Sequence, residues 1–447
     1  MEKFIQKNYK KIAIVICVLG ILFRTIYIVE NPIRKNQYDC KIWSLYDLND
    51  YEQVYEMNED NIGKAGHMYY IFTIYNTWSL PDSAGGQYYH PPLHHFISAV
   101  WLKVMDIFPL NAMQKIESLQ VLSLIYSIIM LLFCYKIIEK TKIKEMGKIV
   151  SLILINFFPI FIYMAGFVNN DMLITMLTVM SLYYIIKWNE NSNIFNTMKL
   201  TIVFALGMMT KTSIMVMILP LAVIVLRKMI IEIKNKDKKI IKSIIIQAII
   251  FVILVGIASV WFPIRQWVKY GFEPFSIQKP YDHFFSGDAS FVERWGFFSK
   301  DIIKNRLEVE DKNIFACVIN SSLYCLYNFE SAIAYMLKEI TVMFAIISLI
   351  ITLKVFIEKI IKKEFDVVFT LIITFFSWII GFILFNISLP YSCTMNSRYI
   401  AILFLISNII LGYSVSERKN KLWKYTILTL AIILTILSII ILFSKPI

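Results

Sequence analysis

Residues 66–101, GHMYYIFTIYNTWSLPDSAGGQYYHPPLHHFISAVW, hold four of the five histidines of the chain, a Tyr-Tyr-His-Pro-Pro run and a Gly-Gly turn. A segment does not need such a cluster in order to cross a bilayer. One interpretation is an aromatic segment at the membrane interface, where Tyr and Trp are enriched. The other is a functional centre around which the membrane-spanning segments are arranged. The histidines are His67, His90, His94 and His95.

The sequence on both sides of this stretch is that of a polytopic membrane protein. The chain has 447 residues, of which 58% are hydrophobic, and long apolar runs recur along it. Only a helix satisfies its own backbone hydrogen bonds in each such run when it crosses lipid. We therefore predict an all-α fold with about 11 to 13 transmembrane helices and no soluble catalytic domain. The whole chain, 1–447, is expected to be one integral-membrane domain.

The net charge of +13 reports topology rather than a nucleic-acid partner. Lys and Arg residues cluster in short segments between the apolar runs, as the positive-inside rule requires. The basic residues before a first span at about residues 12–29 place the N-terminus in the cytoplasm. Six scattered cysteines form neither a disulfide framework nor a zinc motif. Abundant Lys, Ile and Asn favour a bacterial protein, which places the chain in the plasma membrane.

Two long segments are then expected on the outer side, at residues 30–90 and 263–330. The first is rich in acids and should carry short interfacial helices, since long ordered loops tend to hold function. Residues 92–108 are too short for a comfortable crossing and are predicted to be interfacial or re-entrant, with a full crossing as the alternative. Residues 199–227 predict two half-length helices that meet at Lys211. An ionisable residue at such a turn is a candidate functional site.

The polar residues that stand out gather on this predicted outer side. A membrane enzyme that moves a sugar from a lipid phosphate needs a carboxylate to take the proton of the acceptor hydroxyl. It also needs fixed cations that stabilise the departing phosphate. The candidates are the first-loop acids Asp39 and Asp47, with His67, His90, Asp171, Lys211, Arg265, Arg398 and Tyr399.

The order of the motifs resembles the C-type integral-membrane glycosyltransferases. After the acid-bearing loop come His-Pro-Pro-Leu at 90–93, Asn-Asp at 170–171, Gly-Met-Met-Thr-Lys at 207–211 and a late Arg-Tyr at 398–399. Within that class the chain is most similar to bacterial relatives of the dolichyl-phosphate-mannose protein mannosyltransferases and the aminoarabinose transferases. The similarity covers most of residues 10–410.

The resemblance implies roles for several residues. Asp39 takes the place of the general base, with His67 second and Asp47 third, although Asp39 lacks the Glu that follows it in the family pattern. Lys211 would face the lipid phosphate, while Arg265 and Arg398, with Tyr399 beside it, would clamp that group.

Simpler roles remain open for each of these residues. Asp39 can be a solvated loop acid, Lys211 can snorkel, and Arg265 or Arg398 can be an interfacial anchor. Asp171 can cap its helix. His90, before Pro-Pro, can be a structural histidine or share a divalent cation with an acid, whereas His94 and His95 are expected to face the helix bundle or the lipid headgroups.

The resemblance implies an inverting hexosyl or pentosyl transferase that uses a polyprenyl-phosphate-linked monosaccharide on the outer face of the membrane. The acceptor hydroxyl would belong to a protein, a glycan or a lipid. The alternative is a transporter or lipid-linked-sugar flippase without transferase activity. A transporter would place charges along a midplane pathway, whereas the candidate groups here gather beside large outer loops. A relative that binds the lipid-linked sugar without turnover is the third option.

Overall fold

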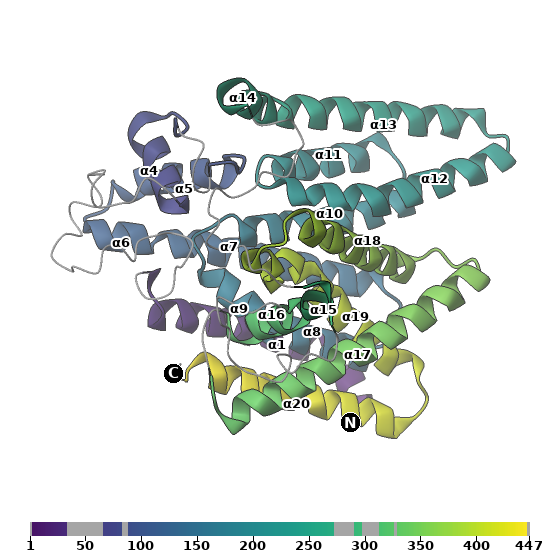
Figure 1. The fold of residues 1–447 in the computed structure, drawn as a ribbon. Helices are drawn as coiled ribbons and strands as arrows, with labels where there is room; N and C mark the ends of the chain where they lie inside the picture. The colour runs from purple at the N-terminus through teal and green to yellow at the C-terminus, as the bar shows by residue number, and fades with distance from the viewer. Residues whose placement is uncertain are drawn as a thin grey trace. The chain divides into compact units, whose positions relative to one another are not determined.

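The computed structural model describes residues 2–33, 66–82, 88–271, 290–296, 313–325 and 329–444. Every regular element within these ranges is a helix (Figure 1), which confirms the predicted all-α class. Two of the predicted base candidates, Asp39 and Asp47, lie outside the described residues. The residues form two compact units: unit 1 holds 1–27, 131–164 and 282–447, and unit 2 holds 28–130 and 165–281.

Nine helices in the described part of the chain are long and apolar enough to cross a membrane. The number rises to ten if α8 (Glu145–Phe157) and the short α9 (Pro159–Tyr163), which are bent by 53°, make one broken span. Proline at the start of α9 explains the bend, because it cannot donate the helical hydrogen bond that would continue α8. The polytopic architecture predicted from hydropathy is therefore confirmed.

Unit 1 is built around the contact between α8 and α19, and small residues bring the two backbones together. A Cβ atom on Gly147 would lie 2.2 Å from the carbonyl oxygen of Gly412, so neither position admits a larger side chain without a shift. In chain order, the helices of this unit are most of α1 (Glu2–Glu30), the end of α7 (Leu119–Lys140), α8, α9, α15 (Phe291–Trp295), α16 (Ile314–Tyr324), α17 (Ala332–Ile361), α18 (Val367–Ser388), η7 (Ser392–Met395), η8 (Ser397–Ile400), α19 (Ala401–Glu417) and α20 (Lys421–Leu442).

Unit 1 also contains a fully buried arginine within the span α1. Arg24 donates hydrogen bonds to the carbonyl oxygens of Gly20 at 2.9 Å and Asn156 at 2.8 Å. Its charge is thus directed at backbone dipoles of α1 and α8, which is how a guanidinium is accommodated inside a helix bundle. We read Arg24 as a residue that fastens α1 to α8.

Unit 2 is organised around α10, which is 78% buried over its apolar window and is the most buried of the candidate spans. The helix α11 packs against both α10 and α13, and α13 also contacts α12 (Figure 1). The helices of this unit are α4 (His67–Thr77), α5 (Leu93–Met105), α6 (Ala112–Glu117), most of α7, the end of η3 (Met164–Gly166), α10 (Asp171–Glu190), α11 (Ile194–Met208), η4 (Thr212–Met217), α12 (Ile218–Lys234), α13 (Lys238–Ser259) and α14 (Trp261–Tyr270).

Two predictions about short segments have different outcomes. The helix α5 has 13 residues and reaches about 20 Å, less than the ~30 Å hydrocarbon core, in agreement with a segment that does not cross alone. The prediction of two half-length helices in 199–227 is wrong for the second one. Residues 212–234 form a continuous 23-residue helix that is long and apolar enough to cross a membrane. Its length exceeds the prediction because helical structure continues through the basic residues after 226.

Candidate active site

The centre of the candidate site is an ion pair between Asp171 and Lys211 in unit 2. Lys211 Nζ lies 2.6 Å from Asp171 Oδ1, and the two side chains are only 12% and 4% exposed. Asp171 is the first residue of α10 and Lys211 directly precedes η4. The sequence predicted Lys211 as the residue that faces the lipid phosphate and Asp171 as a site candidate or a helix cap, and the structure brings the two together.

The turn that carries Lys211 is fixed by its backbone. The amide nitrogen of Lys211 donates to the carbonyl oxygen of Gly207 at 2.8 Å. A Cβ atom on Gly207 would lie 2.1 Å from Ile214 Cδ1, so a larger residue there would require the end of the Ile214 side chain to move. Two further contacts attach the turn to its surroundings: Leu93 N donates to Met209 O at 3.0 Å, and Asn170 Nδ2 donates to Thr210 O at 3.4 Å. The His-Pro-Pro-Leu segment and the Asn-Asp turn therefore meet at the lysine turn.

A histidine cluster lies on the two short helices α4 and α5. His67 Nδ1 is 2.9 Å from His95 Nε2, and the ring of Tyr70 stacks on His95 with centroids 3.9 Å apart. His90 stacks on His67 at 5.9 Å, and its carbonyl oxygen accepts a hydrogen bond from the Tyr70 hydroxyl. The hydrogen bond between His67 and His95 fixes the orientation of the His67 ring. The third group of a catalytic triad orients its base in the same manner.

Burial decides the charge of the two histidines on α5. It lowers the pKa of His94 to about 3, with His67 acting in the same direction and the Asp171 carboxylate opposing them. Burial, with help from the other histidines, also lowers the pKa of His95 well below its usual range. Both imidazoles are therefore neutral at neutral pH. The prediction that they face the helix bundle or the headgroups resolves to the bundle, since both are buried.

Both ring nitrogens of His94 are buried without a hydrogen-bond partner among the described residues. The preceding residue, Leu93, donates its backbone N–H to Met209 O of the lysine turn at 3.0 Å, so the start of α5 lies beside that turn. The helix that carries His94 and His95 thus begins at the turn that carries Lys211.

Arg265 connects α14 to the segment that enters this site. Its guanidinium donates to Pro81 O at 3.1 Å and lies over the Tyr270 ring at 5.7 Å. The next residue, Gln266, donates to Tyr88 O at 2.9 Å. The Arg265 charge also acts on the Tyr70 hydroxyl, whose pKa is raised by burial and lowered by that charge. Arg265 therefore attaches α14 to the chain at Pro81, between α4 and α5.

Arg398 and Tyr399 belong to unit 1, at the turn between α18 and α19. The Arg398 guanidinium donates to the Tyr399 hydroxyl at 3.3 Å and lies over its ring at 5.1 Å. The turn is held by Asn396, whose side chain accepts from Arg398 N, and by Ser321, which accepts from Ser397 N. These two predicted residues contact each other.

One buried cation of unit 1 was missed by sequence reasoning. Arg294, in the short helix α15, is 6% exposed and donates to Asn386 Oδ1 at 3.0 Å and to Tyr391 O at 3.4 Å. The signal was available, since Ser290 and Glu293 form a capping box that announces a helix within the second large loop.

The alternative in which His90 shares a divalent cation with an acid of the first outer loop is not tested, because the acids at residues 39–60 lie outside the described residues. Within the described ranges no group of three or more His, Cys, Asp or Glu side chains is arranged to hold a metal ion. The His90 ring stacks on His67 and lies against Tyr89.

Comparison with known proteins adds two findings. Residues 89–262 match the family model described as dolichyl-phosphate-mannose-protein mannosyltransferase. That range contains His90, His94, His95, Asp171 and Lys211. No curated protein sequence matches the chain.

The fold is similar to that of a solved structure, the archaeal oligosaccharyltransferase AglB from Archaeoglobus fulgidus in complex with an inhibitory peptide and a dolichol-phosphate. The TM-score is 0.52 at 12% sequence identity, over 97% of this chain and 56% of that one. The chain thus spans little more than half the length of AglB. The family match and the shared fold together confirm that this chain resembles the C-type integral-membrane glycosyltransferases.

Proposed function

We propose that this chain is an inverting glycosyltransferase that moves a hexose or pentose from a polyprenyl-phosphate-linked donor to an acceptor hydroxyl. The observation that carries the proposal is the buried Asp171–Lys211 pair at a turn held against the start of α5. It lies inside the part of the chain that matches the mannosyltransferase family. The AglB structure contains a dolichol-phosphate, which supports a donor of the same chemical class here.

Lys211 is the proposed contact of the donor phosphate. An ammonium has three N–H donors, so the bond to Asp171 at 2.6 Å is compatible with a further one to a phosphate oxygen. The phosphate gains negative charge as the bond to the sugar breaks, and a fixed cation at that point stabilises the transition state more than the ground state. Asp171 is then a positioning residue that aims the ammonium.

The proton of the acceptor hydroxyl needs a base on the other side of the sugar. Asp39 remains the first candidate and Asp47 the third. His67 is the candidate within the described residues, and its hydrogen bond to His95 supports it, because a fixed ring orientation suits a general base. Asp171 is a poor candidate, since a carboxylate that is paired with a lysine is a weaker base.

Arg265, Arg398 and Tyr399 are proposed to contribute to donor binding. A guanidinium has five N–H donors, so the single bond from Arg265 to Pro81 O leaves donors for a phosphate. The stacking of the Arg398 guanidinium on the Tyr399 ring would hold that planar group in one orientation for a phosphate.

The site is proposed to lie on the outer face of a bacterial plasma membrane. In unit 2, the start of α10 and the end of α11 meet at Lys211, whereas the opposite ends of α12 and α13 carry the basic residues between 227 and 242. The positive-inside rule places that basic loop in the cytoplasm and Lys211 on the other side. An acceptor hydroxyl on a protein, a glycan or a lipid is consistent with such a location.

The test is sugar transfer in native membranes, with a panel of radiolabelled polyprenyl-phosphate sugars. We expect label in an acceptor fraction with one donor of the panel, and loss of that label in the Lys211→Ala variant. Movement of the lipid-linked sugar across vesicles without any label transfer would support the flippase instead. The absence of transfer with every donor would refute the proposed activity.

A further inference from the structure

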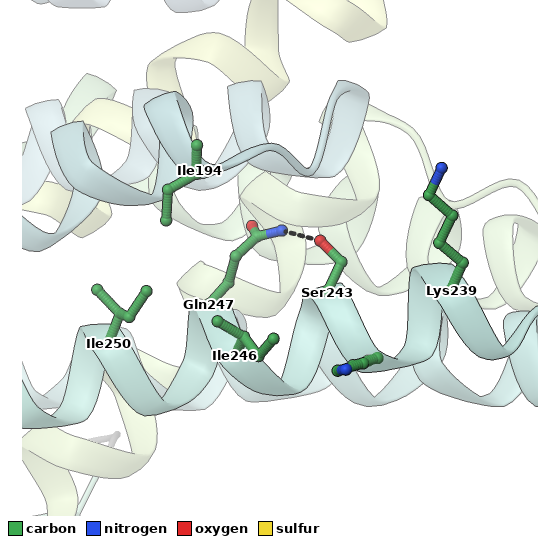
Figure 2. Close-up of a pocket in the computed structure, with 7 residues that line it drawn as sticks. Ile194, Lys239, Ser243, Ile246, Gln247 and Ile250 are labelled. Atoms are coloured by element: carbon green, nitrogen blue, oxygen red, sulfur yellow. Dashed lines mark hydrogen bonds between the residues drawn. The ribbon is translucent and has the colours of Figure 1, made fainter.

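A groove of about 380 Å³ lies on one face of α13 in unit 2. It is beside the start of α11 and the start of α13, whereas Lys211 follows the end of α11. Figure 2 shows Lys239, Ser243, Gln247 and Ile250 on the side of α13 that faces Ile194 of α11. The groove is lined by Lys239, Lys242 and Ser243 toward the start of α13, and by Ile246 and Ile250 further along.

The order of these residues along the helix separates charge from apolar surface. The lining positions of α13 recur at intervals of three and four, which places them on one face. The two lysines lie in the first two turns and the isoleucines in the next two, so the stripe changes from cationic to apolar over about 16 Å. Ile194 extends the apolar side from α11. A ligand with an anionic head and a hydrocarbon tail matches this gradient.

The lining contains two lysines and no acid. The nearest acid along the chain, Asp237, caps the start of α13 by accepting from the backbone nitrogens of Lys239 and Ile240 at 3.1 and 3.0 Å. The groove therefore carries positive charge that its own residues do not neutralise.

The floor of the groove is ordered by Gln247, which is 3% exposed. Its amide nitrogen donates to Ser243 Oγ at 2.9 Å, and its oxygen accepts from Trp188 Nε1 at 2.9 Å and from Thr197 Oγ1 at 2.6 Å. Because Ser243 Oγ accepts from Gln247, its hydroxyl hydrogen is oriented to donate elsewhere.

A larger cavity of about 640 Å³ in unit 1 differs in this respect. Its lysines are interspersed with acids, and Lys359 is paired with Glu364 at 2.7 Å and Asp366 at 2.8 Å. That cavity is largely neutralised from within, whereas the α13 groove is not.

We propose that the α13 groove binds an anionic phospholipid of the surrounding membrane. The phosphate lies between the ammonium groups of Lys239 and Lys242 with the Ser243 hydroxyl as a third donor, and an acyl chain follows Ile246 and Ile250. Basic pockets between membrane helices are suited to such headgroups. The inference is independent of the proposed glycosyl transfer, since the groove shares no residue with the candidate active site.

The test is native mass spectrometry of the purified full chain, titrated with phosphatidylglycerol or with phosphatidylcholine of the same acyl chains. We expect one phosphatidylglycerol to bind more tightly than any phosphatidylcholine. The Lys239→Ala, Lys242→Ala double variant should weaken that binding about thirtyfold, given the usual contribution of each lysine near an anionic lipid.

The matched control is the Lys234→Ala, Lys238→Ala double variant, which removes the same charge from the same basic loop outside the groove. It should retain the bound lipid. Equal weakening by the two double variants would overturn the proposal, because the lipid would then respond to the charge of the loop as a whole.

Two other results would also overturn it. Equal binding of phosphatidylcholine would show that the charge is not used. Full competition by glycerophosphoglycerol, the same headgroup without acyl chains, at concentrations similar to those of the lipid would show a site for a soluble anion. An Ile246→Ser variant should weaken the binding of phosphatidylglycerol and leave any binding of glycerophosphoglycerol unchanged.

Discussion

Breaking the Asp171–Lys211 pair from one side should destabilise the protein far more than removing both charges. At an effective dielectric of about 20, unit charges 2.6 Å apart attract by about 6 kcal/mol, and desolvation of the buried groups offsets part of this. Removing one partner of a buried pair costs about 3–5 kcal/mol, since the other charge stays buried without compensation. Asp171→Asn and Lys211→Met should each lie in that range.

The double variant should fall within about 2 kcal/mol of the wild type, so the coupling energy of the cycle should be at least about 4 kcal/mol. The assay is denaturant unfolding of the purified full chain in micelles, followed by tryptophan fluorescence. The control is the exposed pair Lys187–Glu190 on the same helix α10, 3.6 Å apart, whose removal should change the unfolding free energy by about 0–1 kcal/mol. Additive losses in the Asp171 and Lys211 cycle would refute a coupled buried pair.

The remaining predictions concern donor use, the base, acid stability and topology. Lys211→Ala should abolish use of the lipid donor and Lys211→Arg should retain part of it, since charge is kept with altered geometry; unchanged turnover in Lys211→Ala would contradict the phosphate contact. Asp39→Asn should lower turnover about 10²–10⁴-fold with donor affinity kept. If His67 is the base instead, His67→Ala abolishes transfer and activity falls as imidazole is protonated. His94 has a pKa of about 3 when folded and about 6.5 when unfolded, so its stabilising effect is complete above about pH 6.5 and is lost as the pH falls toward 3. Over that window His94→Asn should flatten the pH dependence of the unfolding free energy by about 1.4 kcal/mol per pH unit. Single cysteines in 30–90, 263–330 and 389–397, on a cysteine-free background, should react with an impermeant maleimide in intact cells. Labelling of cysteines in 234–239 instead would contradict the predicted orientation, in which that loop lies in the cytoplasm.

The sequence alone was sufficient where the property is local. The hydropathy of each segment predicted most of the spans. An apolar run that crosses lipid has to satisfy its own backbone hydrogen bonds by forming a helix, wherever the rest of the chain lies. The order of short motifs was enough to indicate the family resemblance, since motif order is a property of the linear chain.

Local reasoning failed where a boundary depended on packing. The stretch after Lys211 was predicted to be half-length, yet the helix continues to Lys234. The first basic residues of its last turns contact α10: Arg227 donates to Asn189 Oδ1 at 3.5 Å and Lys228 lies over the Trp188 ring at 5.6 Å. Hydropathy therefore ends the helix earlier than its packing does.

Only the tertiary structure decided which candidate residues contact each other. Asp171 and Lys211 are 40 residues apart, and His67 and His95 are 28 apart. A contact over such separations depends on the length and direction of every helix and turn between them, which no local pattern specifies. The same fold decided that His94 and His95 are neutral, because burial sets their charge and depends on which helices cover α5. Residue type and motif order thus came from the sequence, whereas pairing and protonation came from the packing of helices distant in the chain.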